Sequence, residues 1–212
     1  MMRNWWWAGL GLVGVGWLLL IIVQPVVGDW MPPDISFSQY GVGGYGWMLS
    51  GYLIGMALGS LCLDRAIPTG RITTAFLVIG TLGCLLMAFV RTDPGGLQQS
   101  AQAKVHVIGS VVGLIGIPIG ACLSAVRSGR IARAWPLTFA GISAFSLVLL
   151  LISATGVDTL GVGSNTSWAY WQTAAMLADS VLTVLTMIVA GRVVGESDHS
   201  KSPNSLSADA PV

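Results

Sequence analysis

Six long apolar runs, almost free of charged residues, limit what this chain of 212 residues can fold into. About 20 consecutive apolar residues span a bilayer as a helix, whereas the strands of a membrane barrel alternate in polarity and are about 10 residues long. The continuous runs therefore predict an all-α fold, a polytopic integral membrane protein with a six-helix transmembrane bundle. We expect the spans at Trp5–Val27, Trp47–Leu63, Ile72–Val90, Val105–Val126, Pro136–Ala154 and Trp168–Ala190.

The composition also argues against a soluble protein. Charged residues make up 9% of the chain and apolar residues 54%, while ordinary soluble domains are about 25% charged. The first run is longer than the core of a signal peptide, which has about 7–15 residues, so we expect an uncleaved span. Residues 1–192 then form one transmembrane domain, and the polar residues 193–212, rich in Ser, form a disordered cytoplasmic tail.

The basic residues predict how the spans are oriented. With a cytoplasmic N-terminus, eight of the ten Lys and Arg residues lie in cytoplasmic segments and two lie outside. Basic residues are enriched on the cytoplasmic side of a membrane, so we expect both termini inside, in the plasma membrane. The eight are Arg3, Arg65, Arg71, Arg127, Arg130, Arg133, Arg192 and Lys201, and the two are Arg91 and Lys104.

Glycine and serine positions predict local details of the bundle. Gly51, Gly55 and Gly59 repeat every four residues, which places them on one helix face where a second helix can approach closely. Ser100 is of a type that caps helix N-termini, so we expect the fourth helix to begin there. The glycine-rich segment 28–46 is expected to fold back over the bundle, because irregular backbone beside lipid must pack on protein or face water.

The segment Arg91–Gly109 gathers the densest polar chemistry between the apolar runs. It turns at Asp93 and Pro94 and enters the fourth run with His106, the only histidine outside the C-terminal tail. This histidine is either a hydrogen-bonded structural residue or an acid, base or metal ligand, with Asp93 or Asp34 as its orienting carboxylate. Four residues of the fourth helix share one face, which we expect to point into the bundle: Gln102, His106, Ser110 and Gly113.

Asp179 is the second polar feature, because it lies near the middle of the sixth run. A charged aspartate at the bilayer centre costs roughly 2.5–3.5 kcal/mol on insertion scales, and such residues usually face the bundle interior and mark function. Gln172, Thr183 and Thr186 continue a polar stripe at helical spacing. Two interpretations of Asp179 stay open: a residue that takes up a proton, and a hydrogen-bonded residue that joins the sixth span to serines of the fifth.

The sequence lacks most catalytic and cofactor motifs. It has no second membrane-embedded histidine for a zinc site, no nucleophile elbow, no phosphate-binding glycine loop followed by lysine and no basic aromatic surface for nucleic acid. We therefore expect no metal, no cofactor and no nucleic-acid partner. The absence favours a protein that is not an enzyme, although it does not exclude a membrane enzyme.

Two parts of the sequence resemble a known family. The segment Pro32–Leu61, PPDISFSQYGVGGYGWMLSGYLIGMALGSL, and the combination of Asp93 and Pro94 with His106 are similar to the membrane family catalogued as domain of unknown function 998. The resemblance covers most of residues 5–192. It implies a six-helix prokaryotic membrane protein and supplies no activity. Asp93, Pro94 and His106 match the family pattern, in which no counterpart of Asp179 is identified.

These features lead to three hypotheses. The first is a non-enzymatic protein that binds a lipid or small amphiphile in an outward-facing polar vestibule, or assists a partner membrane protein. The second is a proton-linked transporter of small solutes that uses Asp179, and the third is an outward-facing lipid-modifying enzyme with His106 as general base, oriented by Asp93. The expected partners are membrane lipids and either another membrane protein or further copies of the chain. The expected vestibule has Asp179 as its floor, His106 and Ser110 as its wall, and Asp34, Tyr40, Arg91 and Asp93 as its rim.

Overall fold

The computed structural model describes residues 2–29, 35–67, 70–96, 99–127 and 134–199, and these residues form an all-helical structure without strands. Six of the described helices are long and apolar enough to cross a membrane. The protein is therefore a multi-pass membrane protein, as the apolar runs predicted. The elements are α1 (Met2–Val27), α2 (Phe37–Tyr40), α3 (Gly46–Ala66), α4 (Arg71–Phe89), the 3-10 helix η1 (Pro94–Gly96), α5 (Ala101–Arg127), α6 (Ala134–Ala154) and α7 (Ser164–His199).

The start of α5 agrees with the prediction, and the end of α7 differs from it. The hydroxyl of Ser100 accepts the N–H of Ala103 at 3.0 Å, so Ser100 caps α5 as predicted. At the other end of the chain α7 continues to His199, beyond the predicted start of the tail at residue 193. No proline stands between the sixth span and Pro203, so the backbone can remain helical into the polar sequence. The rest of the predicted tail, together with Arg130, Arg133 and Lys201, lies outside the described residues.

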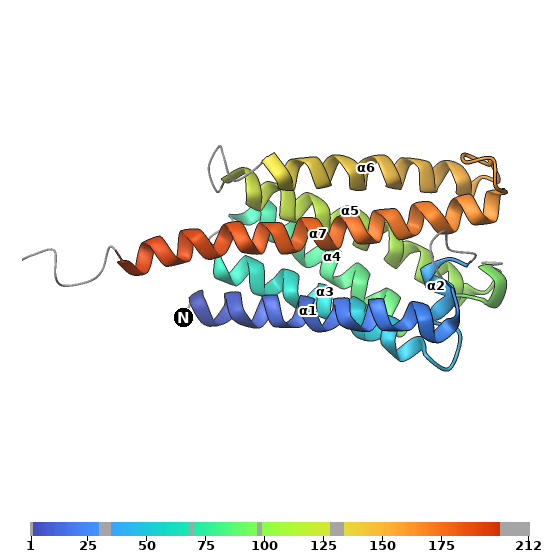
Figure 1. The fold of residues 1–212 in the computed structure, drawn as a ribbon, viewed down its shortest axis with the longest axis horizontal. Coiled ribbons are helices and arrows are strands. Elements are labelled where there is room, and N and C mark those ends of the chain that lie inside the picture. Colours follow the sequence, from blue (N-terminus) through green and yellow to red (C-terminus); the bar gives the residue numbers. More distant parts are fainter. Residues whose placement is uncertain (1, 30–34, 68–69, 97–98, 128–133, 200–212) are drawn as a thin grey trace, which may run out of the picture.

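The six long helices lie side by side along the length of the molecule, as Figure 1 shows. The N-terminus and the end of α7 lie at one end of the bundle, and α2 lies at the opposite end, called here the α2 end. In the most apolar 18-residue stretch of each span, 61% of α3 and 67% of α7 are buried, against 22% of α1 and of α6. Thus α3 and α7 are central, and α1 and α6 are peripheral. Helix α6 packs chiefly against α7 and less against α5.

Glycines allow two helix pairs to pack closely. A Cβ atom on Gly55 of α3 would lie 2.6 Å from the carbonyl oxygen of Leu12 in α1, closer than van der Waals contact permits. The predicted close approach along the glycine face of the second span is therefore confirmed. In the same way, a Cβ on Gly83 of α4 would lie 2.7 Å from the carbonyl oxygen of Gly109 in α5. These contacts hold α1 against α3 and α4 against α5.

The short helix α2 covers part of the α2 end, which agrees with the expected fold-back of this segment (Figure 1). The Gln39 side chain donates to the carbonyl oxygen of Asp93 at 3.0 Å and accepts the N–H of Gly95 at 2.8 Å. Tyr40 is buried and donates to the carboxylate of Asp29 at 2.6 Å. Burial and this carboxylate raise the pKa of the Tyr40 hydroxyl. The segment is therefore fixed to the bundle through backbone and side-chain hydrogen bonds.

Candidate functional site

His106 lies in the second turn of α5, at the α2 end of the bundle. Its side chain is buried with 5% exposed, and Nδ1 lies 2.5 Å from the carbonyl oxygen of Val90 at the end of α4. Ser110, one turn further along α5, donates its hydroxyl to the carbonyl oxygen of His106 at 3.0 Å. The predicted inward face is thus present for His106 and Ser110. Gly113 on the same face is buried as well, whereas Gln102, one turn before His106, is exposed.

A cavity of about 110 Å³ lies beside His106 and is called here the α2 cavity. It is enclosed by α2, α5, α6, α7 and the segment after α4. Its polar lining residues come from four of these five parts of the chain: Ser38, Thr92, His106, Ser110 and Gln172. Its remaining lining is apolar and includes Leu114, Leu147, Leu150 and Leu151. A mostly apolar cavity with a few convergent polar groups is typical of small-ligand sites.

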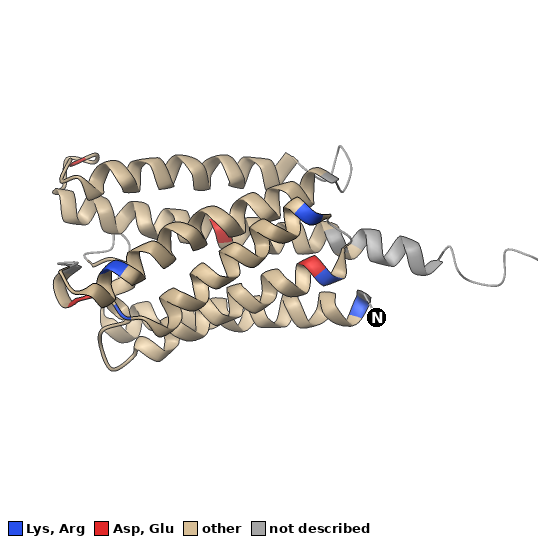
Figure 2. Ribbon diagram, turned by 180° about the vertical axis from the view of Figure 1, so that it is seen from behind, with Lys and Arg blue, Asp and Glu red and all other residues tan. Residues whose placement is uncertain are grey.

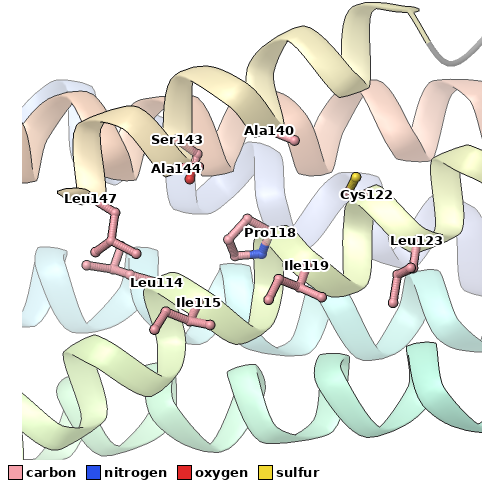
Figure 3. Close-up of a pocket in the computed structure, with 10 residues that line it drawn as sticks. All are labelled: Leu114, Ile115, Pro118, Ile119, Cys122, Leu123, Ala140, Ser143, Ala144 and Leu147. Carbon is pink, nitrogen blue, oxygen red and sulfur yellow. The ribbon is translucent and has the colours of Figure 1, made fainter.

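A second hollow of about 260 Å³ lies between α5 and α6 and is called here the α5–α6 groove. Figure 3 shows the two helices on either side of it, with Pro118 and Ile119 reaching in from α5 and Ala144 lying on α6. Almost all of its lining side chains are apolar. Leu114 and Leu147 belong to this groove and also to the α2 cavity. The two hollows therefore adjoin at this pair of leucines.

Asp179 lies on α7 in the middle of the bundle and is buried with 5% exposed. The charged residues of the described chain otherwise gather towards the two ends of the bundle, as Figure 2 shows. The hydroxyl of Ser143 on α6 donates to Oδ1 of Asp179. Asp179 lines a separate pocket of about 20 Å³, whose other walls include Tyr52, Met56 and Leu114. The structure therefore brings His106 and Ser110 together in the α2 cavity, while Asp179 lines a different pocket that shares Leu114 with this cavity.

The residues expected at the rim are not among the lining residues of the α2 cavity in the described part of the chain. Tyr40 points to Asp29, and Arg91 is exposed. Asp93 accepts the backbone N–H groups of Gln99 and Ser100, both at 2.8 Å, and the hydroxyl of Ser100 at 2.5 Å. Asp34 lies outside the described residues.

Hydrogen bonding gives Asp93 a local structural role. The Ser100 hydroxyl, followed by the backbone N–H groups, holds the pKa of Asp93 below its usual range. These bonds fix the turn that leads into α5. The hydrogen-bond partner of His106 in the structure is Val90, and the carboxylate oxygens of Asp93 accept bonds from residues 99 and 100.

Several lining residues were not singled out by the sequence. Ser38 and Thr92 stand in irregular segments without periodicity, and only the proximity of Thr92 to Asp93 marks it. Leu114 and Leu147 are two of many leucines and carry no distinguishing signal. Gln172 is different, since it precedes Asp179 by seven residues and so shares its helix face. Among the described residues, no group of three or more His, Cys, Asp or Glu side chains could hold a metal ion.

Comparison with known proteins adds a family. The family model described as "Protein of unknown function (DUF998)" matches residues 8–190. The match contains Asp93, His106 and Asp179, and it confirms the resemblance found in the sequence. No curated protein and no solved structure matches the chain.

Proposed function

The chain belongs to the DUF998 family of proteins of unknown function, and we propose that this member binds an amphiphile, a lipid-like molecule with a polar head and an apolar tail. The head occupies the α2 cavity beside His106. The tail passes Leu114 and Leu147 and lies in the α5–α6 groove, which faces the lipid. The bound molecule thus spans the two adjoining hollows.

The observation that carries this proposal is the pair of leucines shared by the two hollows. Polar lining is concentrated on one side of that pair, in the α2 cavity. The groove on the other side is almost wholly apolar, with Ser143 as its hydroxyl-bearing residue. An amphiphile matches this division. Burial of its apolar tail lowers the free energy, and burial of its polar head costs least free energy where hydrogen-bond partners are present. A fully polar solute would leave the groove unfilled.

The distribution of basic residues supports an orientation for this site. Arg3, Arg65 and Arg71 belong to the end of the bundle at which the N-terminus lies, and Figure 2 shows basic residues there. The positive-inside rule supports a cytoplasmic location for that end. We propose that both termini are cytoplasmic in the plasma membrane, and that the α2 cavity opens outward. The head of the ligand then lies at the outer leaflet.

The local contacts favour binding over the two alternatives. Asp179 is hydrogen-bonded to Ser143 in a pocket of about 20 Å³, which supports its role in joining α7 to α6 more than a role as a proton carrier. The carboxylate of Asp93 is bonded to Ser100 and its backbone, so it does not supply the orienting carboxylate that a His106 general base would use.

A matched pair of substitutions on α6 tests the proposal. Ala144 lines the groove and is exposed, so Ala144→Trp fills the space that the tail occupies without entering the protein core. Ile142 is 44% exposed and does not line the groove, so Ile142→Trp adds the same ring elsewhere on the helix. Native mass spectrometry after gentle detergent extraction measures the retained lipid. We expect the wild type and Ile142→Trp to retain the lipid, and we expect Ala144→Trp to lose most of it.

 

The α2 cavity has its own pair of variants. Leu151 lines that cavity although it is 49% exposed, and Val148 on the same helix is 54% exposed and does not line it. Leu151→Trp is expected to reduce the retained lipid, as is Ala144→Trp, while Val148→Trp leaves it unchanged. Size-exclusion profiles identify any variant that fails to fold. Full lipid retention in both Ala144→Trp and Leu151→Trp, with both variants folded, would overturn the proposal.

A further inference from the structure

The polar groups of the α2 cavity have unused hydrogen-bonding capacity. The partner of His106 Nδ1 is the carbonyl oxygen of Val90. A carbonyl oxygen only accepts, so the proton of a neutral imidazole is assigned to Nδ1, and Nε2 carries a lone pair. Among the described residues, Nε2 has no hydrogen-bond partner. The cavity is therefore lined by an α5 residue with a free acceptor, Nε2 of His106.

Donors are present in the same cavity. The carbonyl oxygen of the Gln172 side chain accepts the N–H of Ser38 at 3.5 Å, which leaves the amide NH₂ of Gln172 to donate. Neither this NH₂ group nor the hydroxyl of Thr92 has a partner within the described ranges. A ligand group that both donates and accepts would satisfy His106 on one side and Gln172 or Thr92 on the other.

No Lys, Arg, Asp or Glu is among the described residues that line the α2 cavity or the α5–α6 groove. Asp93 is bonded to Gln99 and Ser100, and Arg91 is exposed and is not among the lining residues. A phosphate or carboxylate placed in this cavity would lose its hydration without a cation to compensate it. The lining thus disfavours a charged head.

We propose that the ligand is a neutral lipid with a hydroxyl head, such as a diacylglycerol, and that its hydroxyl bonds to His106 Nε2 and to Gln172 or Thr92. This inference rests on the proposed amphiphile binding and adds the chemical class of the head. A hydroxyl is the smallest head group that both donates and accepts. It also needs no counter-charge when it is buried.

The test compares two photoactivatable lipids with identical acyl chains, a diacylglycerol and a phosphatidic acid. Each is incorporated into phosphatidylcholine vesicles that contain the full-length protein, and crosslinks to α5 and α6 peptides are quantified by mass spectrometry. Because two hydrogen bonds and the absence of a buried charge favour the hydroxyl head, diacylglycerol should label roughly fivefold more than phosphatidic acid. Ala144→Trp gives the background.

Variants of the cavity sharpen the test. Thr92→Val and His106→Phe remove polar partners with little change in shape, and each should reduce the preference for diacylglycerol. Ser110→Lys places a cation in the cavity and should shift the labelling toward phosphatidic acid. Size-exclusion profiles, together with labelling above background by at least one of the two lipids, identify the variants that are folded.

The outcomes separate this inference from the proposed function. Equal or stronger labelling by phosphatidic acid in the wild type would overturn the neutral head and leave amphiphile binding intact. Labelling by neither lipid above the Ala144→Trp background, together with no retained lipid after extraction, would overturn amphiphile binding itself. Preferential labelling by diacylglycerol that disappears in His106→Phe supports both.

Discussion

At the scale of single residues, burial of a polar group requires a partner, and Asp179 illustrates this. Its carboxyl group lies deep in an apolar bundle and accepts the hydroxyl of Ser143 from the neighbouring helix. Hydrogen bonds between transmembrane helices contribute about 0.6 kcal/mol on average and up to about 1.7 kcal/mol. The pair is therefore a modest but specific link between α6 and α7.

Ser143→Ala removes this donor and is expected to lower the free energy of unfolding by about 1 kcal/mol. Ser146→Ala is the matched control, because Ser146 is equally buried on the same helix and is not bonded to Asp179. Denaturant titration in mixed micelles measures both variants. An equal loss in the two variants would show that the bond to Asp179 adds nothing specific.

The carboxylate of Asp93 predicts a pH dependence. Its pKa is lower in the folded protein than the ordinary value of 3.8, because the Ser100 hydroxyl and backbone N–H groups stabilise the charged form. Its contribution to stability is therefore complete above about pH 4 and is lost as pH falls through the lowered pKa. Thermal unfolding from pH 7 to pH 2 should show the wild type more stable than Asp93→Asn at pH 7, with the difference shrinking below about pH 4. A difference that persists unchanged at the lowest pH would contradict the assignment.

At the scale of helices, small residues decide which pairs pack closely. Gly80, Gly83, Gly109 and Gly116 bring the backbones of α4 and α5 together. In contrast, α5 and α6 are separated by the groove, which exists because α6 packs chiefly on α7. One face of α5 is thus fixed to α4 while another lines the proposed ligand path.

Gly83→Ala tests the close contact between α4 and α5. The new Cβ would lie 2.7 Å from the carbonyl oxygen of Gly109, so we expect a loss of about 1–3 kcal/mol in unfolding free energy. Gly141→Ala is the control, since a Cβ at that helical position meets nothing within 4 Å. Alanine favours helices more than glycine does, so this control should be neutral or slightly stabilising. Comparable destabilisation of the two variants would argue against a specific contact at Gly83.

At the scale of the whole molecule, the two ends of the bundle differ in what they present. The N-terminal end carries Arg3, Arg65 and Arg71, while the α2 end carries short irregular segments and the α2 cavity. The basic residues of the N-terminal end support the proposed cytoplasmic location of that end. The α2 cavity at the opposite end supports the proposed position of the ligand head at the outer leaflet.

The orientation is tested by labelling from outside the cell. Thr155 is exposed in the described structure and belongs to the α2 end. Thr155→Cys should react with a membrane-impermeant maleimide in intact cells, whereas a cysteine added after Val212 should react only after lysis. The wild type, whose three cysteines all lie within spans, serves as the control. The reverse pattern of labelling would invert the topology.

The sequence predicted the helices well because their signals are local. The length of each apolar run sets a span, and the four-residue spacing of Gly55 and its neighbours sets a packing face. The two adjoining hollows could not be predicted, because they depend on the distance between α5 and α6. Leu114 and Leu147 acquire their role only from that distance. The sequence also led us to expect Asp179 and His106 around one vestibule, whereas in the structure they line two different pockets.

The central claim is that one elongated molecule occupies the α2 cavity and the α5–α6 groove together. Cryo-electron microscopy of the protein in nanodiscs made with lipids from its native membrane tests this directly. We expect a continuous density from His106, past Leu114 and Leu147, to Ala144, and its loss in Ala144→Trp. Ordered lipid only on other faces of the bundle, with both hollows empty in the wild type, would contradict the claim.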